Sequence, residues 1–334
     1  MKKKILLIGG EGYIGSVTAL YLLSKGYKVV SYDNLIFNNN NSVLSKRYNL
    51  NFKFVYGDLK NQKLLKKIII ENNINVVVLL AGLVGDPITK KYPKYSKTIN
   101  DILVSNTINL VKKMNLDNFI FVSTCSNYGL ITDDAIADEN FDLKPLSLYA
   151  KSKVRAEKAT LKSTLNKFYR PTVLRFATAF GISPRMRFDL TVNEFTREMF
   201  LNKKIDVYDP DTWRPYCHVL DFARAIKTVF ESKSSKTSFE VFNVGSSANN
   251  ATKRMIVNLV KTKIDDTRIN YLRNSNDKRN YRVNFTKIEK SLSFKTKFSI
   301  EYGIDEILNF LKDGFFDKKL VNKNEYGNYF LKQS

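Results

Sequence analysis

Short apolar runs alternate with amphipathic stretches along the first half of the chain. Continuous apolar runs occupy residues 5–8, 76–80 and 119–122, and mostly apolar runs occupy residues 29–32 and 52–56. Between them, apolar residues recur at helical spacing, most clearly in residues 64–70 and 96–114. A strand without polar interruption is typical of a parallel sheet that is covered on both faces. The alternation therefore predicts an α/β fold built on a doubly wound parallel sheet.

A glycine-rich turn links the first apolar run to a helical stretch. Gly10, Gly12 and Gly15 form the pattern G-x-G-x-x-G, and the next apolar run ends at Asp33. Glycines let a backbone approach a pyrophosphate, and a helix N-terminus supplies N–H groups that lack partners. Asp33 stands 18 residues after Gly15, near the spacing of a carboxylate that hydrogen-bonds an adenosine ribose. A 2′-phosphate would be repelled there, so we expect NAD rather than NADP.

A hydroxyl-rich segment follows the fifth apolar run and precedes a further helix. Thr124 lies where that strand is expected to end, and Tyr149 and Lys153 are one helical turn apart. A lysine ammonium favours a neighbouring phenolate, so we expect the pKa of Tyr149 to fall toward working pH. Such a phenolate can take a proton from an alcohol while hydride leaves the same carbon, and Thr124 could hold the hydroxyl. An ordinary surface pair is the alternative interpretation of this spacing.

Together these motifs resemble the extended short-chain dehydrogenase/reductase family, in particular its NAD-dependent nucleotide-sugar epimerases and dehydratases. The resemblance covers about residues 4–312. It is carried by Gly9-x-x-Gly12-x-x-Gly15, Asp33, Gly57-Asp58-Leu59, Leu80-Ala81-Gly82, Asn100, Ser123-Thr124, Tyr149-x-x-x-Lys153, Leu174-Arg175-Phe176, Trp213 to Asp221, and Asn243-Val244-Gly245. It implies a Rossmann-type sheet with a smaller C-terminal α/β substrate domain.

The resemblance implies roles for individual residues. Thr124, Tyr149 and Lys153 form the catalytic set, and Tyr149 and Lys153 also contact the cofactor, Lys153 at the nicotinamide ribose. The other residues expected to bind NAD are Gly9, Gly12, Tyr13, Ile14, Gly15, Asp33, Asn34, Asp58 (at the adenine), Leu59, Ala81, Gly82 and Asn100.

The expected partner is a nucleotide-diphosphate sugar. The residues expected to bind it are Thr124, Thr178, Arg187, Arg214 and Arg279. Arg214 and Arg279 suit a diphosphate because guanidinium groups match the geometry of phosphate oxygens. A surface salt bridge is the alternative interpretation of Arg214, and His218 in the same motif is expected to be a structural histidine.

Three positions depart from the family pattern. The 4,6-dehydratases of the family carry Asp-Glu directly after the catalytic threonine, which supplies acid and base for the loss of water. Cys125 and Ser126 stand there in this chain, and neither does that work at neutral pH without help. Thr178 replaces an asparagine that contacts the substrate phosphate in many relatives.

We therefore expect an NAD-dependent epimerase or 4-dehydrogenase, and not a dehydratase. It would act at carbon 4 of a nucleotide-activated sugar, through a 4-keto intermediate, in surface-polysaccharide sugar biosynthesis. A 4-ketoreductase is one alternative, and a catalytically silent NAD(H)-sensing protein is an alternative of another class. The resemblance also implies a homodimer through the helix of Tyr149 and the helix from about Ser96. Ala150, Val154 and Leu161 could line that interface, although an intramolecular core explains them equally well.

The second half of the chain breaks into shorter elements. Helices are expected at about residues 191–200, 221–230, 253–260 and 300–311. We predict an NAD-binding domain over residues 1–180, to which segments of 210–250 return, and a substrate domain mainly over 181–320. Residues 321–334 are expected to form a tail; the chain is polar and aromatic from about Lys318, and we expect that end to be loosely ordered or packed at a surface.

Composition narrows the classes of function further. The formal net charge is +23, from 55 basic and 32 acidic residues, but the lysines are scattered, so we expect a solvated surface and no nucleic-acid partner. Two cysteines, Cys125 and Cys217, and the single His218 predict neither a metal site nor a disulfide framework. The N-terminal apolar run is too short for a signal peptide, and no run reaches the length of a membrane span. We expect a cytoplasmic protein without a membrane partner.

Overall fold

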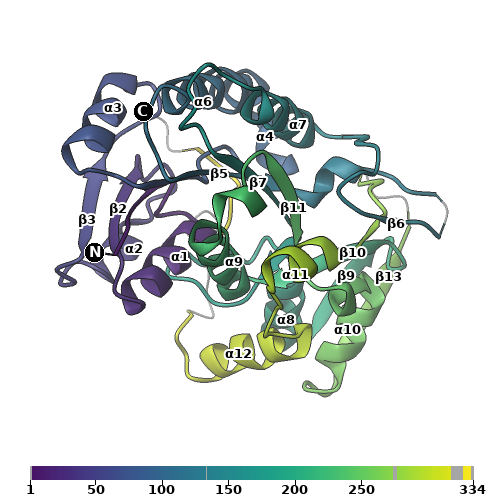
Figure 1. Cartoon of the computed structure of the whole chain (residues 1–334). Coiled ribbons are helices and arrows are strands. Elements are labelled where there is room, and N and C mark those ends of the chain that lie inside the picture. Colours follow the sequence, from purple (N-terminus) through teal and green to yellow (C-terminus); the bar gives the residue numbers. More distant parts are fainter. Residues whose placement is uncertain (1, 133, 274–276, 317–325, 332–334) are drawn as a thin grey trace.

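A doubly wound parallel sheet forms the centre of the computed structural model, which describes residues 2–132, 134–273, 277–316 and 326–331 (Figure 1). Within these residues the sheet has seven strands in the order β11-β7-β5-β4-β1-β2-β3. In that order they span Glu240–Val244, Pro171–Phe176, Asn118–Thr124, Val76–Leu79, Lys4–Ile8, Lys28–Asp33 and Phe52–Tyr56. All neighbouring pairs are parallel. The predicted fold class is confirmed.

Helices cover both faces of this sheet. One face packs on α3 (Gln62–Glu71), α6 (Val104–Val111) and α7 (Leu148–Leu161), above the sheet in Figure 1. The other packs on α1 (Tyr13–Ser24), α9 (Val219–Glu231) and α11 (Thr286–Leu292). Every residue of β4 and β5 is buried, which is why these strands read as unbroken apolar runs.

A smaller lobe follows β7. A three-stranded sheet combines β8 (Thr178–Phe180), β10 (Trp213–His218) and β12 (Asn250–Thr252). A separate core lies among α8 (Thr191–Asn202), α10 (Lys253–Lys261), α12 (Ile300–Lys312) and β9 (Lys204–Tyr208), which pairs with β13 (Arg268–Leu272). The remaining elements are short: α2 (Asn40–Leu44), α4 (Asp86–Lys91), α5 (Pro93–Ser96), η2 (Cys125–Tyr128), β6 (Ile136–Ala137), η3 (Ser234–Lys236), η4 (Ser247–Asn249) and β14 (Arg282–Val283).

The two lobes share an interior. One core cluster contains Ile5 of β1 together with Leu311 of α12, and β11 enters the central sheet from the later part of the chain. The division at about residue 180 therefore stays a proposal, because no break in packing marks it.

One predicted helix is interrupted. The stretch expected as a single helix over residues 96–114 consists of α5, a π-helical segment η1 (Lys97–Leu103) and α6. Within η1, the Asn100 amide donates to the Leu83 carbonyl at 3.0 Å and accepts from the Leu83 N–H at 2.7 Å. A π turn is common where a helix must aim a side chain at a functional site.

The end of the described chain bears on the prediction of a tail. Residues 317–325 and 332–334 lie outside the described residues, but 326–331 pack against the body of the protein. Asn328 is buried, and the Phe188 N–H donates to the Tyr326 carbonyl at 2.7 Å. For these six residues the structure agrees with the second of the two expected alternatives, packing at a surface, and not with loose order.

Across the described ranges, no helix combines the length and the apolar character that crossing a membrane requires.

Candidate active site

A cavity of about 550 Å³ runs along the carboxyl ends of the parallel strands and on to the smaller lobe. Ligands of open α/β sheets bind at this edge. With the exception of Asn100, every predicted site residue lines it: Gly9, Gly12, Tyr13, Ile14, Gly15, Asp33, Asn34, Asp58, Leu59, Ala81, Gly82, Thr124, Tyr149, Lys153, Thr178, Arg187, Arg214 and Arg279. Asn100 instead holds the backbone of Leu83, and so shapes the loop that forms one wall.

The glycine-rich turn fits a pyrophosphate. Gly9 has a φ of 82°, and a Cβ there would stand 2.6 Å from the Ala81 nitrogen. A Cβ on Gly15 would stand 2.5 Å from the Gly9 carbonyl oxygen. Packing therefore requires both glycines. At Gly12 the nearest atom would be 3.5 Å away, so the protein itself leaves room there, beside the cavity, for a ligand that approaches the backbone.

Asp33 offers its carboxylate to the same cavity. Its Oδ2 accepts from the Glu11 N–H at 3.0 Å, and its Oδ1 accepts from the Leu35 N–H at 2.8 Å. Both oxygens retain lone pairs for the hydroxyls of a ribose. Asn34 donates to the Asp58 carboxylate at 2.8 Å, which joins the ends of β2 and β3 at the expected adenosine side.

A second carboxylate near Asp33 was missed by the sequence interpretation. Glu11, inside the glycine-rich turn, forms a fully buried ion pair with Lys46 at 2.9 Å and accepts from the Ser31 hydroxyl at 2.6 Å. The pair ties the turn to the segment after β2. An acid within a glycine motif was the available signal.

NAD affinity is expected to depend on the protonation of Asp33. Burial raises the pKa of Asp33 to about 6, against hydrogen bonds from the Leu35 and Glu11 N–H groups that lower it. If NAD binds the ionised carboxylate, its affinity is full at neutral pH and falls about tenfold for each pH unit below that pKa. Calorimetric titration of NAD between about pH 7.5 and pH 5 measures this. The Asp33→Asn variant should bind NAD more weakly, with an affinity that does not change with pH. An equally steep fall of affinity with pH in that variant would contradict the assignment.

The three predicted catalytic residues meet at one wall of the cavity. Ser147 caps α7 by accepting from the Ala150 N–H at 3.1 Å, which sets Tyr149 and Lys153 in the first turns of that helix. The Lys153 ammonium donates to the Val122 carbonyl at 2.7 Å and lies 5.9 Å from the centre of the Tyr149 ring. Thr124, at the end of β5, accepts from the Ser126 N–H at 3.1 Å.

The expected lowering of the Tyr149 pKa is not found in the unliganded chain. Burial raises the pKa of Tyr149 well above its ordinary value, and the charge of Asp86 adds to the rise, while Arg187 and Arg279 oppose it. Burial also lowers the pKa of Lys153 to about 8, against Glu157, which raises it. The prediction was wrong here because it counted the charge of Lys153 and ignored the desolvation of both groups.

Two arginines mark the other end of the cavity. Arg279 forms ion pairs with Asp277 at 2.7 Å and with Asp86 at 2.9 Å, and Arg214 pairs with Asp277 at 3.1 Å. Burial would raise the pKa of Asp277, but its contacts with Arg279 and Arg214 hold it well below the ordinary value. The acids keep two cations close together, as the binding of a diphosphate requires. Sequence interpretation missed both acids.

Arg187 has a partner of its own. Its guanidinium makes two hydrogen bonds to Asp189, at 2.9 and 2.6 Å. It influences the pKa of Tyr149, so it lies toward the catalytic tyrosine. Thr178 begins β8 in the same wall, and Ser126, which is 3.3 Å from Arg279, faces the space between the two ends.

A family model agrees with this geometry. The model described as "NAD dependent epimerase/dehydratase family" matches residues 5–245 of the chain, a range that includes the glycine turn, the catalytic wall and Arg214. The chain belongs to this family. NAD, the cofactor expected from the sequence, is the cofactor of the family.

Individual relatives are similar over most of the chain. "Protein CapI" of Staphylococcus aureus is 28% identical, over 92% of this chain and 97% of its own. A UDP-glucose 4-epimerase of Rhizobium meliloti is 27% identical, over 75% and 79%. The crystal structure of dTDP-glucose 4,6-dehydratase from Bacillus anthracis, in complex with NAD, superposes with a TM-score of 0.83 at 27% identity, over 95% of this chain and 99% of that one.

Family members thus include both epimerases and a dehydratase, so the reaction of this chain has to be argued from its own residues. His218 takes no part in it. The Nδ1 of His218 accepts from the Leu220 N–H at 3.3 Å at the start of α9, and Nε2 bonds Glu306 at 3.0 Å. This is the structural role expected from the sequence.

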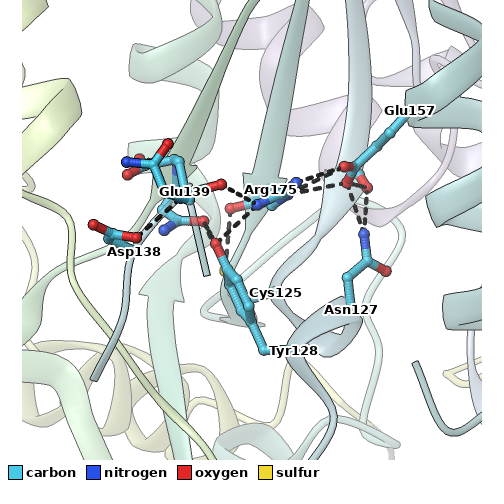
Figure 2. Close-up of polar contacts among 10 residues, drawn as sticks. Cys125, Asn127, Tyr128, Asp138, Glu139, Glu157 and Arg175 are labelled. Carbon is cyan, nitrogen blue, oxygen red and sulfur yellow. Dashed lines mark hydrogen bonds and ion pairs between the residues drawn. The ribbon is translucent and has the colours of Figure 1, made fainter. Parts of the chain in front are cut away.

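A buried network supports the catalytic wall from behind. Figure 2 shows Arg175 of β7 between Glu157 and Tyr128. Its guanidinium donates to the Glu157 carboxylate at 2.9 Å and to the Tyr128 hydroxyl at 3.1 Å. Asn127 donates to the same carboxylate at 2.7 Å. Because Glu157 lies one turn after Lys153 on α7, the network fixes that helix against the sheet and against η2.

Proposed function

We propose that the protein is an NAD-dependent 4-epimerase of a nucleotide-diphosphate sugar. One observation carries the proposal: Thr124, Tyr149 and Lys153 line a single cavity together with the glycine turn and the Arg214–Arg279 pair. A cavity with a dinucleotide end, an acid–base wall and a diphosphate end suits oxidation of a sugar that is held by its nucleotide.

The chain's own residues would perform the proton transfer. Tyr149 takes the proton of the sugar 4-hydroxyl, Thr124 orients that hydroxyl, and Lys153 stabilises the phenolate. The glycine turn and Asp33 would hold NAD, which would supply reversible acceptance of hydride from carbon 4. Arg214 and Arg279 hold the diphosphate while the sugar turns over between the two hydride transfers.

The loop after Thr124 favours epimerisation over dehydration. Cys125 is buried, its thiol lies 3.2 Å from the Arg175 carbonyl, and it does not line the cavity. Burial raises the pKa of the Cys125 thiol well above its ordinary value, so it is a poor acid or base. Ser126 does line the cavity but carries no titrating group in the working range. No carboxylate follows the threonine to eliminate water.

Relatives suggest the class of substrate and pathway. The similar epimerase of Rhizobium meliloti is named for UDP-glucose, and the similar protein of Staphylococcus aureus is named CapI. We extend these to a UDP-sugar used in surface-polysaccharide synthesis. The two unpaired, buried cysteines fit a cytoplasmic location.

The proposal is tested by incubating the full chain with UDP-glucose, UDP-glucuronate, UDP-N-acetylglucosamine and GDP-mannose. Products are identified by nuclear magnetic resonance, and NADH is followed by absorbance. The expected result is a sugar inverted at carbon 4, with no net NADH and no loss of water. A product lighter by one water would replace epimerase with dehydratase.

Three other outcomes define the alternatives. Stoichiometric NADH with a stable keto sugar would indicate a 4-dehydrogenase, and turnover only with a keto sugar and NADH would indicate a 4-ketoreductase. NAD binding without turnover on any sugar nucleotide would favour the sensing protein. The intact set of Thr124, Tyr149 and Lys153 supports the enzymatic proposals.

We also propose a homodimer through the helix pair of α7 and η1. Arg155 of α7 binds Asp101 of η1 at 2.7 Å, which holds the two elements side by side. Ile102 and Leu148, on the same elements, are half exposed. Ala150 is fully buried within the chain, so an intramolecular contact accounts for it.

A further inference from the structure

Arg185 is a buried cation that the proposed reaction does not use. It precedes α8, lines the cavity and is 4% exposed. Its guanidinium donates to the carbonyls of Met186 at 3.1 Å and Gly327 at 2.9 Å, and to the Asn328 side-chain oxygen at 3.0 Å. These oxygens are all neutral. Among the ion pairs of the described residues none includes Arg185, whereas Arg187 has Asp189.

These contacts leave the buried charge of Arg185 without a direct ion pair among the described residues. A buried charge is costly unless an opposite charge accompanies it. Burial, with the neighbouring Arg187, lowers the pKa of Arg185 to about 10, against the charges of Asp189 and Asp33, which raise it. A guanidinium has five N–H donors, and three hydrogen bonds are made to the protein. Arg185 therefore has donors and charge to offer to an anion in the adjoining cavity.

Two contacts place Arg185 at the dinucleotide end. Its guanidinium lies 5.0 Å from the centre of the Phe37 ring, which follows Asp33 by four residues. Ser183, two residues before Arg185, donates to the Tyr13 carbonyl at 2.8 Å and bonds the Ser16 hydroxyl at 3.0 Å. Tyr13 and Ser16 form the first turn of α1, the N-terminus at which a dinucleotide pyrophosphate sits.

We propose that Arg185 binds the pyrophosphate of the bound dinucleotide, together with the N–H groups of the glycine turn. The diphosphate of the sugar nucleotide is the other source of the same chemistry, but Arg214 and Arg279 already serve that end. The inference rests on the dinucleotide part of the proposed function and not on the identity of the sugar.

The C-terminal segment fixes Arg185 in place. Besides accepting from Arg185, Asn328 donates to the Val84 carbonyl at 2.9 Å, and its N–H donates to Asp189 at 3.3 Å. Asn328 thus joins the loop after β4 to the segment before α8, on both sides of the cavity. We assign it as a positioning residue that acts through Arg185.

The test compares three variants of the full chain, freed of NAD, by calorimetric titration with ADP-ribose, NAD and UDP. Arg185→Ala is expected to lower the affinity for ADP-ribose and for NAD by about 10- to 100-fold, the effect of a lost charge-assisted hydrogen bond. Arg185→Lys should recover part of this loss. Asn328→Ala should lower both affinities about fivefold. UDP affinity should stay within about twofold in each. Arg47→Ala, an exposed arginine, is the control.

Two results would overturn the assignment. Unchanged ADP-ribose affinity in Arg185→Ala would show that Arg185 contacts no pyrophosphate. Loss of UDP affinity with ADP-ribose retained would move Arg185 to the sugar nucleotide. The melting temperature of each unliganded variant identifies one that fails to fold, and Arg185→Lys then decides. Because binding is measured without turnover, a wrong sugar assignment leaves this test valid.

Discussion

Tyr149→Phe is expected to reduce turnover by about 10²- to 10⁴-fold, the usual contribution of a general acid–base group. The substitution removes one oxygen and leaves the ring that packs beside Lys153. Affinity for NAD should change little, since most of the expected contacts to the dinucleotide lie along the glycine turn and at Asp33. Turnover is measured by product formation from the sugar nucleotide identified above, at saturating NAD.

Tyr48→Phe is the matched control, because Tyr48 is 92% exposed and lies outside the cavity. Its turnover should equal that of the wild type. Turnover in Tyr149→Phe within tenfold of the wild type would remove Tyr149 from the reaction. Since burial raises the pKa of Tyr149 in the unliganded chain, the wild-type rate should also rise with pH until enough phenolate forms.

Glu157→Ala is expected to lower the free energy of unfolding by about 3–5 kcal/mol, because removing one partner leaves the other charge buried and unpaired. Both side chains of the Glu157–Arg175 pair are at most 6% exposed. Arg175, Asn127 and the Ser123 hydroxyl would lose their shared acceptor. Figure 2 shows Arg175 and Asn127 converging on the Glu157 carboxylate. Chemical denaturation with urea measures the change.

Glu71→Ala provides the comparison. Glu71 also pairs with a cation on a helix, at 3.7 Å from Lys67, but both side chains are more than 60% exposed. Its loss should cost at most about 0.5 kcal/mol. Replacing Glu157 and Arg175 together by methionine should recover much of the stability, because no isolated charge remains. A cost below about 1 kcal/mol in Glu157→Ala would contradict the role given to the network.

Local sequence patterns predicted those parts of the site whose residues lie close together along the chain. The G-x-G-x-x-G turn, the acid at the end of the second strand and the Tyr149-x-x-x-Lys153 spacing each occupy one element or the junction of two. Their relative positions follow from the geometry of a strand or helix. The cavity accordingly contains nearly all of the predicted residues, with Asn100 displaced behind its wall.

Contacts between distant segments were not predictable in the same way. Asp86 and Asp277 meet at Arg279, and Glu11 meets Lys46, because separate loops converge at one edge of the sheet. The pKa of Tyr149 is raised in the unliganded chain, whereas the sequence predicted a lowered one, because desolvation depends on every element packed around the phenol. Asn328, near the C-terminal end of the chain, lines the cavity, and no periodic pattern in the sequence predicts this contact.

By itself the sequence determined the order of strands and helices along the chain, the glycine-rich turn and the residues that we propose as catalytic. These follow from the period of apolar residues and from fixed spacings, which act over a few residues. Only the tertiary structure decided which charges neutralise one another, how far burial shifts the acid–base pair, and that Arg185 lies beside the cavity without a direct ion pair among the described residues. Desolvation and ion pairing depend on distances in space, and the chain sets those distances only when it is folded.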